Sequence, residues 1–143
     1  MNKIEVLKSK RDGLKVKEDI QRFAKEGWES ISEDDIQRLK WYGLFLRNPT
    51  PGYFMQRVRI PNGRCFSHQL KALCSIAKEF GNGIIDITTR QQVQLRHLKI
   101  EDVPQIFTIQ EEVGLTSLQT GMDNVRNIMG CPVAGLSPKE KVD

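Results

Sequence analysis

Histidine and cysteine are scarce in this chain, which contains only two histidines and three cysteines among its 143 residues. The two histidines, His68 and His97, stand alone without the spacing of metal ligands. The three cysteines, Cys65, Cys74 and Cys131, are odd in number and far apart. This pattern is not that of a disulfide framework, a zinc site or an iron–sulfur motif. We therefore expect reduced thiols and no metal ligand in the chain itself.

Long apolar runs are also missing. No stretch approaches the roughly 20 apolar residues that a helix needs to cross a bilayer. The first residues, Met1–Glu5, lack the apolar centre of a signal peptide. We expect no membrane partner and a cytoplasmic location.

Charge of one sign is not concentrated anywhere in the sequence. The formal net charge is +4, but basic residues are interspersed with acidic ones. This mildly basic balance favours acidic partners in general, whereas a nucleic-acid binder is expected to concentrate its basic residues. We therefore expect no nucleic-acid partner. Hydrophobic residues make up 38% of the chain, which is ordinary for a soluble protein with a buried core.

The first third of the chain has a helical pattern. Apolar residues recur at helical spacing over residues 14–23, and Ser32 begins a second helical segment that ends at Gly43. Prolines and a glycine at positions 49–52 then interrupt the chain. The sequence predicts an N-terminal helical arm over residues 1–48.

The remaining residues, 49–143, contain an order of elements typical of a ferredoxin-like unit. Strands are expected over residues 53–60, 84–88, 92–98 and 115–119, and helices over residues 67–81 and 102–114. The order strand, helix, strand, strand, helix, strand is the split βαββαβ unit. The sequence therefore predicts an α+β fold, in which a ferredoxin-like half-domain follows the arm.

Three arginines lie at the ends of different predicted strands. Arg57 belongs to the first strand, Arg90 follows the second, and Arg126 lies beyond the last. A guanidinium is permanently charged and offers a planar fork of donors to carboxylates and small oxyanions. If these side chains converge, they form a cavity suited to an anionic cofactor and an anionic substrate. We expect Arg57, and not Arg59, to face the other two.

The segments that carry these arginines, residues 54–63, 88–91 and 121–127, resemble the N-terminal part of the siroheme-dependent nitrite and sulfite reductases. The resemblance begins upstream at residue 15 and ends with residues 132–135, and it is closest to the ferredoxin-linked nitrite reductases. It implies that the part after the arm comprises a nitrite/sulfite reductase ferredoxin-like half-domain and the start of a siroheme-binding region.

The resemblance also implies roles for individual side chains. Arg57 and Arg126 would be catalytic residues that hold nitrite or sulfite and its reduction intermediates. Asn127 would brace the turn around Arg126 or touch the cofactor. The residues implied to bind siroheme carboxylates are Thr88, Thr89, Arg90, Gln94 and Arg96.

The implied activity is the six-electron reduction of nitrite to ammonia, as in nitrate assimilation, or of sulfite to sulfide. Ferredoxin or a similar protein would donate the electrons. In this family siroheme works with a [4Fe-4S] cluster whose cysteine ligands lie in the C-terminal part of the enzyme, and this sequence lacks them. We therefore expect the chain alone to be inactive without a missing C-terminal half.

Three interpretations stay open. The favoured one is the N-terminal part of a nitrite reductase. The alternatives are one subunit of a split reductase and a stand-alone module that binds a tetrapyrrole or an anion.

Overall fold

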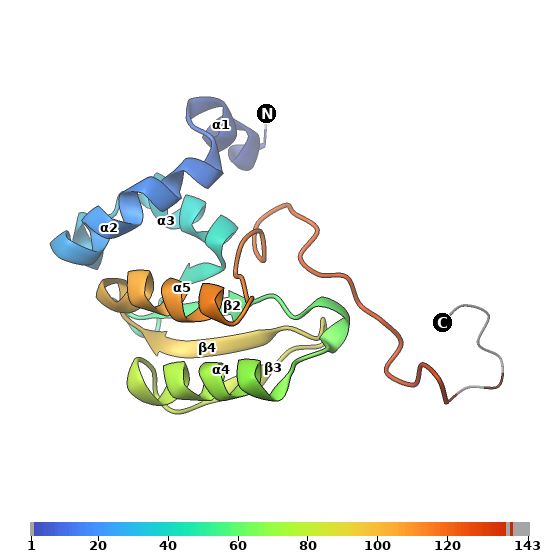
Figure 1. Cartoon of the computed structure of the whole chain (residues 1–143). Coiled ribbons are helices and arrows are strands. Elements are labelled where there is room, and N and C mark those ends of the chain that lie inside the picture. Colours follow the sequence, from blue (N-terminus) through green and yellow to red (C-terminus); the bar gives the residue numbers. More distant parts are fainter. Residues whose placement is uncertain (1, 137, 139–143) are drawn as a thin grey trace.

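An antiparallel four-stranded sheet forms the centre of the computed structural model, which describes residues 2–136 and 138 (Figure 1). The strands are β1 (Leu44–Leu46), β2 (Phe54–Val58), β3 (Ile85–Ile87) and β4 (Val93–Leu98). Their order across the sheet is β1-β2-β4-β3. Helices α4 (Ser67–Glu79) and α5 (Val103–Glu112) pack together against one face of this sheet.

Alternation along the strands separates an apolar face from a polar one. Val58 of β2 and Leu95 of β4 point toward the helices, where they join Ile76 of α4 and Ile106 of α5 in one buried cluster. The intervening residues point to the opposite face. On that face Arg57, Gln94 and Asp86 lie directly opposite one another on β2, β4 and β3.

The predicted α+β class and ferredoxin-like order are confirmed, with a difference at the fourth strand. In place of a strand over residues 115–119, a single antiparallel bridge joins Arg59 to Thr116. The reason is that β1 already pairs with the first half of β2, from Leu44 opposite Gln56 to Leu46 opposite Phe54. Only the residues at the end of β2 and just after it remain free on that side to pair with residues 115–119.

The N-terminal arm consists of α1 (Lys3–Lys10), α2 (Lys17–Glu26) and α3 (Glu33–Leu39). Short 3-10 turns connect the elements of the chain: η1 (Gly13–Val16), η2 (Trp28–Ser30), η3 (Lys40–Tyr42), η4 (Pro61–Gly63) and η5 (Ile100–Asp102). A second buried cluster unites Phe23 and Leu39 of the arm with Phe54 and Val103. The arm and the half-domain therefore share a core, and a domain boundary at residue 48 stays a prediction.

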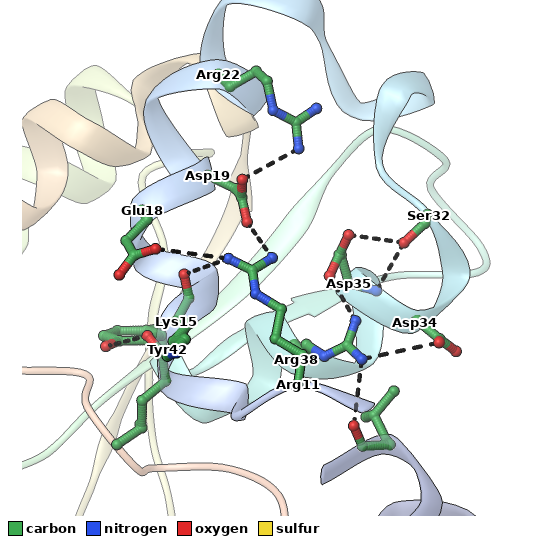
Figure 2. A network of polar contacts seen from close by, with 12 residues as sticks. Arg11, Lys15, Glu18, Asp19, Arg22, Ser32, Asp34, Asp35, Arg38 and Tyr42 are labelled. Carbon is green, nitrogen blue, oxygen red and sulfur yellow. Dashed lines mark hydrogen bonds and ion pairs between the residues drawn. The ribbon is translucent and has the colours of Figure 1, made fainter. Parts of the chain in front are cut away.

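Polar contacts fasten the arm helices to one another (Figure 2). Arg38 of α3 is only 5% exposed, and its guanidinium pairs with Asp35 at 2.8 Å and donates to the carbonyl of Leu7 in α1 at 3.3 Å. Arg11, just after α1, donates to Asp19 of α2 at 2.5 Å. One arginine therefore ties α1 to α3, and the other ties the end of α1 to α2.

Within the described residues, no helix combines the length and the apolar character that a membrane span requires.

Candidate functional site

The chain that follows α5 lies across the end of the sheet, and we call its residues 117–130 the strap. Arg59 holds the first half of the strap, because its Nη2 donates to the carbonyl oxygens of Gln119 at 2.9 Å and Val125 at 3.1 Å. Both acceptors are main-chain atoms. At these two points the course of the strap is therefore fixed through its backbone, whichever side chains stand there.

Amide side chains hold the second half of the strap. The buried Gln92 donates to the carbonyl of Arg126 at 2.6 Å. Asn127 donates in the other direction, from its Nδ2 to the carbonyls of Ile60 at 3.0 Å and Arg90 at 2.8 Å. These bonds join the strap to the end of β2 and to the turn between β3 and β4.

Arg57 lies between the sheet and the strap. Its guanidinium carbon is 5.0 Å from the centre of the Phe45 ring, and its Nη1 donates to the carbonyl of Thr120 at 3.2 Å. Burial, and then the positive charges of Arg126 and Arg90, lower the pKa of the Arg57 guanidinium. The structure therefore brings the three expected arginines into one electrostatic neighbourhood.

The turn around Arg126 is braced from within the strap. Arg126 Nη2 donates to the carbonyl of Met122 at 3.1 Å, and the Asn124 amide donates to the carbonyl of Gly121 at 2.9 Å. Gly121 allows a close approach, because a Cβ atom there would lie 2.3 Å from the carbonyl oxygen of Lys40. The arginine is thus carried on a turn pressed against the 3-10 turn η3.

Thr88, Thr89 and Arg90 occupy the turn between β3 and β4. The Thr88 hydroxyl accepts a hydrogen bond from the backbone nitrogen of Gln92 at 3.1 Å, so it shapes the turn. Thr89 and Arg90 are exposed at the tip. Of these three side chains, Thr89 and Arg90 are the more accessible to a ligand.

Gln94 and Arg96 share the polar face of the sheet with Arg57. Gln94 is directly opposite Arg57. Arg96, however, forms an ion pair with Asp86 of β3, and its Nη2 lies 3.5 Å from the Gln94 amide oxygen. The charge of Arg96 is therefore balanced within the sheet, which the sequence pattern did not indicate.

The expectation that Arg59 faces away from Arg57 is wrong. Only one residue separates the two arginines, and side chains two positions apart on a strand point to the same face. Both guanidinium groups donate to carbonyls of the strap. Arg59 was missed as a structural residue of this site, although its position two residues from Arg57 was a sufficient signal.

The donors at this site fit the siroheme that the resemblance implies. Arg57, Arg90 and Arg126 supply positive charge for carboxylates. Four buried polar atoms around them have no hydrogen-bond partner in the part of the chain that the structure describes: the donors Arg57 Nε and Arg59 Nε, and the acceptors Gln91 Oε1 and Asn127 Oδ1. Buried polar groups are normally satisfied. The carboxylates of a polyanionic group would therefore match the positive charge and the two unsatisfied arginine donors, whereas the two amide oxygens need a donor, which a carboxylate does not supply.

Comparisons with known proteins agree with this description. Residues 47–113 match the family model of the nitrite/sulfite reductase ferredoxin-like half domain. The ferredoxin–nitrite reductases of Leptolyngbya laminosa and Synechococcus elongatus are 50% and 52% identical to the chain over 145 residues. Each match covers 100% of this chain and 28% of the relative, so the chain spans little more than a quarter of their length.

A solved structure extends the comparison to the fold. The Mycobacterium tuberculosis NirA protein is 33% identical, with a TM-score of 0.86 over 95% of this chain and 28% of its own. The match therefore includes most of the arm as well as the sheet and its helices. By sequence and by fold, this chain belongs to the family of nitrite and sulfite reductases that contain the ferredoxin-like half domain.

Proposed function

We propose that the chain is part of a ferredoxin-dependent nitrite reductase and forms an arginine-lined wall of its siroheme and nitrite site. The observation that carries this proposal is that hydrogen bonds to the strap gather the three arginines: Arg57 donates to the carbonyl of Thr120, and the carbonyls of Arg90 and Arg126 accept from Asn127 and Gln92. The pKa of Arg57, lowered by burial and by the charges of Arg126 and Arg90, agrees with this. The relatives that are 50% and 52% identical are named for ferredoxin and nitrite, which supports this donor and this substrate. Their greater length supports a larger enzyme with a C-terminal half beyond this chain.

Siroheme, together with a [4Fe-4S] cluster held outside this chain, would carry electrons from ferredoxin to nitrite in its reduction to ammonia. Arg90 and Thr89 are the side chains best placed to bind its carboxylates, because they lie exposed at the tip of the turn. Gln94 is the better candidate on the sheet, since Arg96 is already paired with Asp86. Asn127 would brace the turn around Arg126 through its amide nitrogen, because its unsatisfied Oδ1 is an acceptor and cannot donate to a carboxylate.

Arg57 and Arg126 would hold the substrate anion. Their permanent charges attract nitrite, and donors that are fixed before the reaction stabilise negative charge without reorganising. An arginine side chain does not release its proton near neutral pH, so these two residues orient and stabilise the anion while other groups deliver protons.

Single substitutions test these roles in the native polypeptide that contains this chain. Arg126→Ala should lower kcat/KM for nitrite about a hundredfold, as for loss of one oriented donor, and leave the siroheme absorbance largely intact. Arg90→Ala should mainly lower the siroheme absorbance per protein. Arg22→Ala is the control, because Arg22 lies on α2 and pairs with Asp19 and Glu26. Unchanged turnover in Arg126→Ala would remove this residue from the proposed site.

The intact mass of the native gene product separates the alternatives. A mass several times the 16.4 kDa of this chain supports a single longer reductase. A mass of 16.4 kDa supports a split reductase if a protein with the cluster cysteines copurifies, and a tetrapyrrole- or anion-binding module if none does. Turnover with sulfite in place of nitrite then tests the substrate, and we expect nitrite to be preferred.

A further inference from the structure

Phe45 of β1 contacts both sides of the site. It lies opposite Met55 in the sheet, and the face of its ring is 5.0 Å from the guanidinium carbon of Arg57. On the side of the strap, a Cβ atom added to Gly121 would lie 2.7 Å from Phe45 Cζ. The ring therefore lies against the arginine and also supports the turn that leads to Arg126.

The other restraints on Arg57 leave its side chain only partly fixed. Its backbone is held firmly, because its nitrogen donates to the carbonyl of Gly43 at 2.8 Å and its carbonyl accepts from the Thr120 hydroxyl at 3.0 Å. Within the described part of the chain, the guanidinium itself makes one hydrogen bond, to the carbonyl of Thr120 at 3.2 Å. Its Nε has no partner among the described residues. The Phe45 ring is thus the main surface against which the guanidinium plane rests.

The contact with the Phe45 ring matters because the charges of the neighbouring arginines repel the Arg57 guanidinium. Burial and the charges of Arg126 and Arg90 disfavour the charged form of Arg57, as the lowered pKa indicates. A guanidinium over an aromatic face is attracted by the ring quadrupole, and the attraction grows as water is removed. The ring therefore offsets part of the repulsion that would otherwise turn Arg57 away from the other two arginines.

We propose that Phe45 is a positioning residue, which holds the Arg57 guanidinium within the arginine cluster and thereby raises the affinity of the cluster for nitrite. This inference rests on the proposed function, since it concerns the same anion site. Nothing in the sequence pattern marks Phe45, because it lies in a strand of three residues near the end of the predicted arm, after its last predicted helix.

Side-chain NMR of the 15N-labelled chain tests the positioning directly. The Arg57 Nε–Hε resonance is assigned by its loss in Arg57→Lys. In the native chain we expect this resonance to be displaced by the ring current of Phe45. Phe45→Leu should move it toward the resonance of the exposed Arg22, whereas Phe45→Tyr, which retains a ring, should leave it near its native position.

Phe107→Leu is the matched control. Phe107 is partly buried on α5 and pairs with Tyr42, with 6.2 Å between the ring centres. The Phe107→Leu substitution removes a phenyl ring on the helix side of the sheet and should leave the Arg57 resonance unchanged. If Phe45→Leu does not fold, Phe45→Met removes the ring with a more flexible side chain and carries the same expectation. An unmoved Arg57 resonance in a folded ring-free variant would overturn the inference.

Titration with sodium nitrite of the siroheme-loaded polypeptide that contains this chain, carrying the same substitutions, tests the consequence. We expect the dissociation constant for nitrite to rise about fivefold in Phe45→Leu, as for the loss of one cation–π contact, and to stay unchanged in Phe45→Tyr and Phe107→Leu. Equal affinity in Phe45→Leu and the native chain would overturn the inference and leave the proposed function standing. Absence of nitrite binding by the native siroheme-loaded polypeptide would overturn the proposed anion site, and this inference with it.

Discussion

The guanidinium of Arg57 is subject to influences that act in opposite directions. Burial and two neighbouring arginines raise the free energy of its charged form. The ring of Phe45 and the carbonyl of Thr120 lower it. A bound anion would relieve the repulsion among the arginines, so part of the binding free energy at this site comes from charge that folding leaves unbalanced.

At the same scale, Gly121→Ala should disturb both stability and the site. The new methyl group would lie 2.3 Å from the carbonyl of Lys40 and 2.7 Å from the Phe45 ring, so one of them must move. We expect a loss of about 1–3 kcal/mol in the free energy of unfolding, typical of overpacking, measured by guanidinium denaturation.

Gly83→Ala is the control for this substitution. Gly83 has a positive φ of 77°, but a methyl group there would meet nothing within 4 Å. It should therefore cost only the strain of the left-handed conformation, about 1 kcal/mol, and leave nitrite binding unchanged. If Gly121→Ala binds nitrite as the native chain does, the close packing of the strap on Phe45 is not important for the site.

At the scale of elements, the buried Arg38 is the main polar tie of the arm. Arg38→Ala would leave Asp35 without its closest cation and free the contact with α1. We expect a loss of about 2–3 kcal/mol in the free energy of unfolding, because removing one partner of a buried pair leaves the other uncompensated. Arg22→Ala, in which both sides of the pair with Glu26 are about half exposed, should cost much less, because exposed ion pairs are screened by water. Similar losses in the two variants, measured in urea, would contradict this view of Arg38.

The elements that the sequence predicted well are those with a sustained period. Helices α4 and α5 and strand β4 have long enough apolar patterns to be read directly. Strand β1 was missed because three consecutive apolar residues show no period, and its pairing with β2 in turn reduced the predicted strand over residues 115–119 to one bridge.

The charged residues of the site could be nominated from the sequence, but the side chains that they contact could not. Sequence position sufficed to nominate Arg57, Arg90 and Arg126, which the structure brings together. The pairing of Arg96 with Asp86 depends on the register of β3 against β4, and the contact of Arg57 with Phe45 depends on the unpredicted β1. Such contacts follow from tertiary packing and have no local pattern. The roles of these residues in binding siroheme and nitrite stay predictions.

At the scale of the whole molecule, ion pairs link distant segments and should make stability depend on acid. Burial alone would raise the pKa of Asp19, but hydrogen bonds from Arg11 and Arg22 outweigh it and lower that pKa. Lys8 of α1 pairs with Asp123 in the strap and lowers the pKa of that carboxyl as well. A carboxyl whose pKa is lowered by folding stabilises the fold at any pH above its pKa in the unfolded chain, here 3.8. This contribution is lost as the pH falls through the pKa of the folded chain.

We therefore expect the free energy of unfolding to fall as the pH drops below about 4, measured by urea denaturation between about pH 7 and pH 3. The difference between the native chain and Asp19→Asn should be largest near neutral pH and should shrink in this acid range. Glu112→Gln, at the exposed end of α5, serves as the control. A difference for Asp19→Asn that stays constant with pH would show that its carboxylate charge does not contribute.

The fastening of the strap through its carbonyl oxygens has a consequence for evolution and for engineering. A main-chain oxygen is the same whichever residue carries it. The hydrogen bonds from Arg59 and Gln92 to the carbonyls of Val125 and Arg126 therefore do not depend on the side chains at these two positions. The outward side chains of Val125 and Ile128, 78% and 73% exposed, are therefore free to change while the path of the chain is conserved. A library that randomises these two positions should yield many folded variants, each presenting a different surface beside the same cluster of arginines.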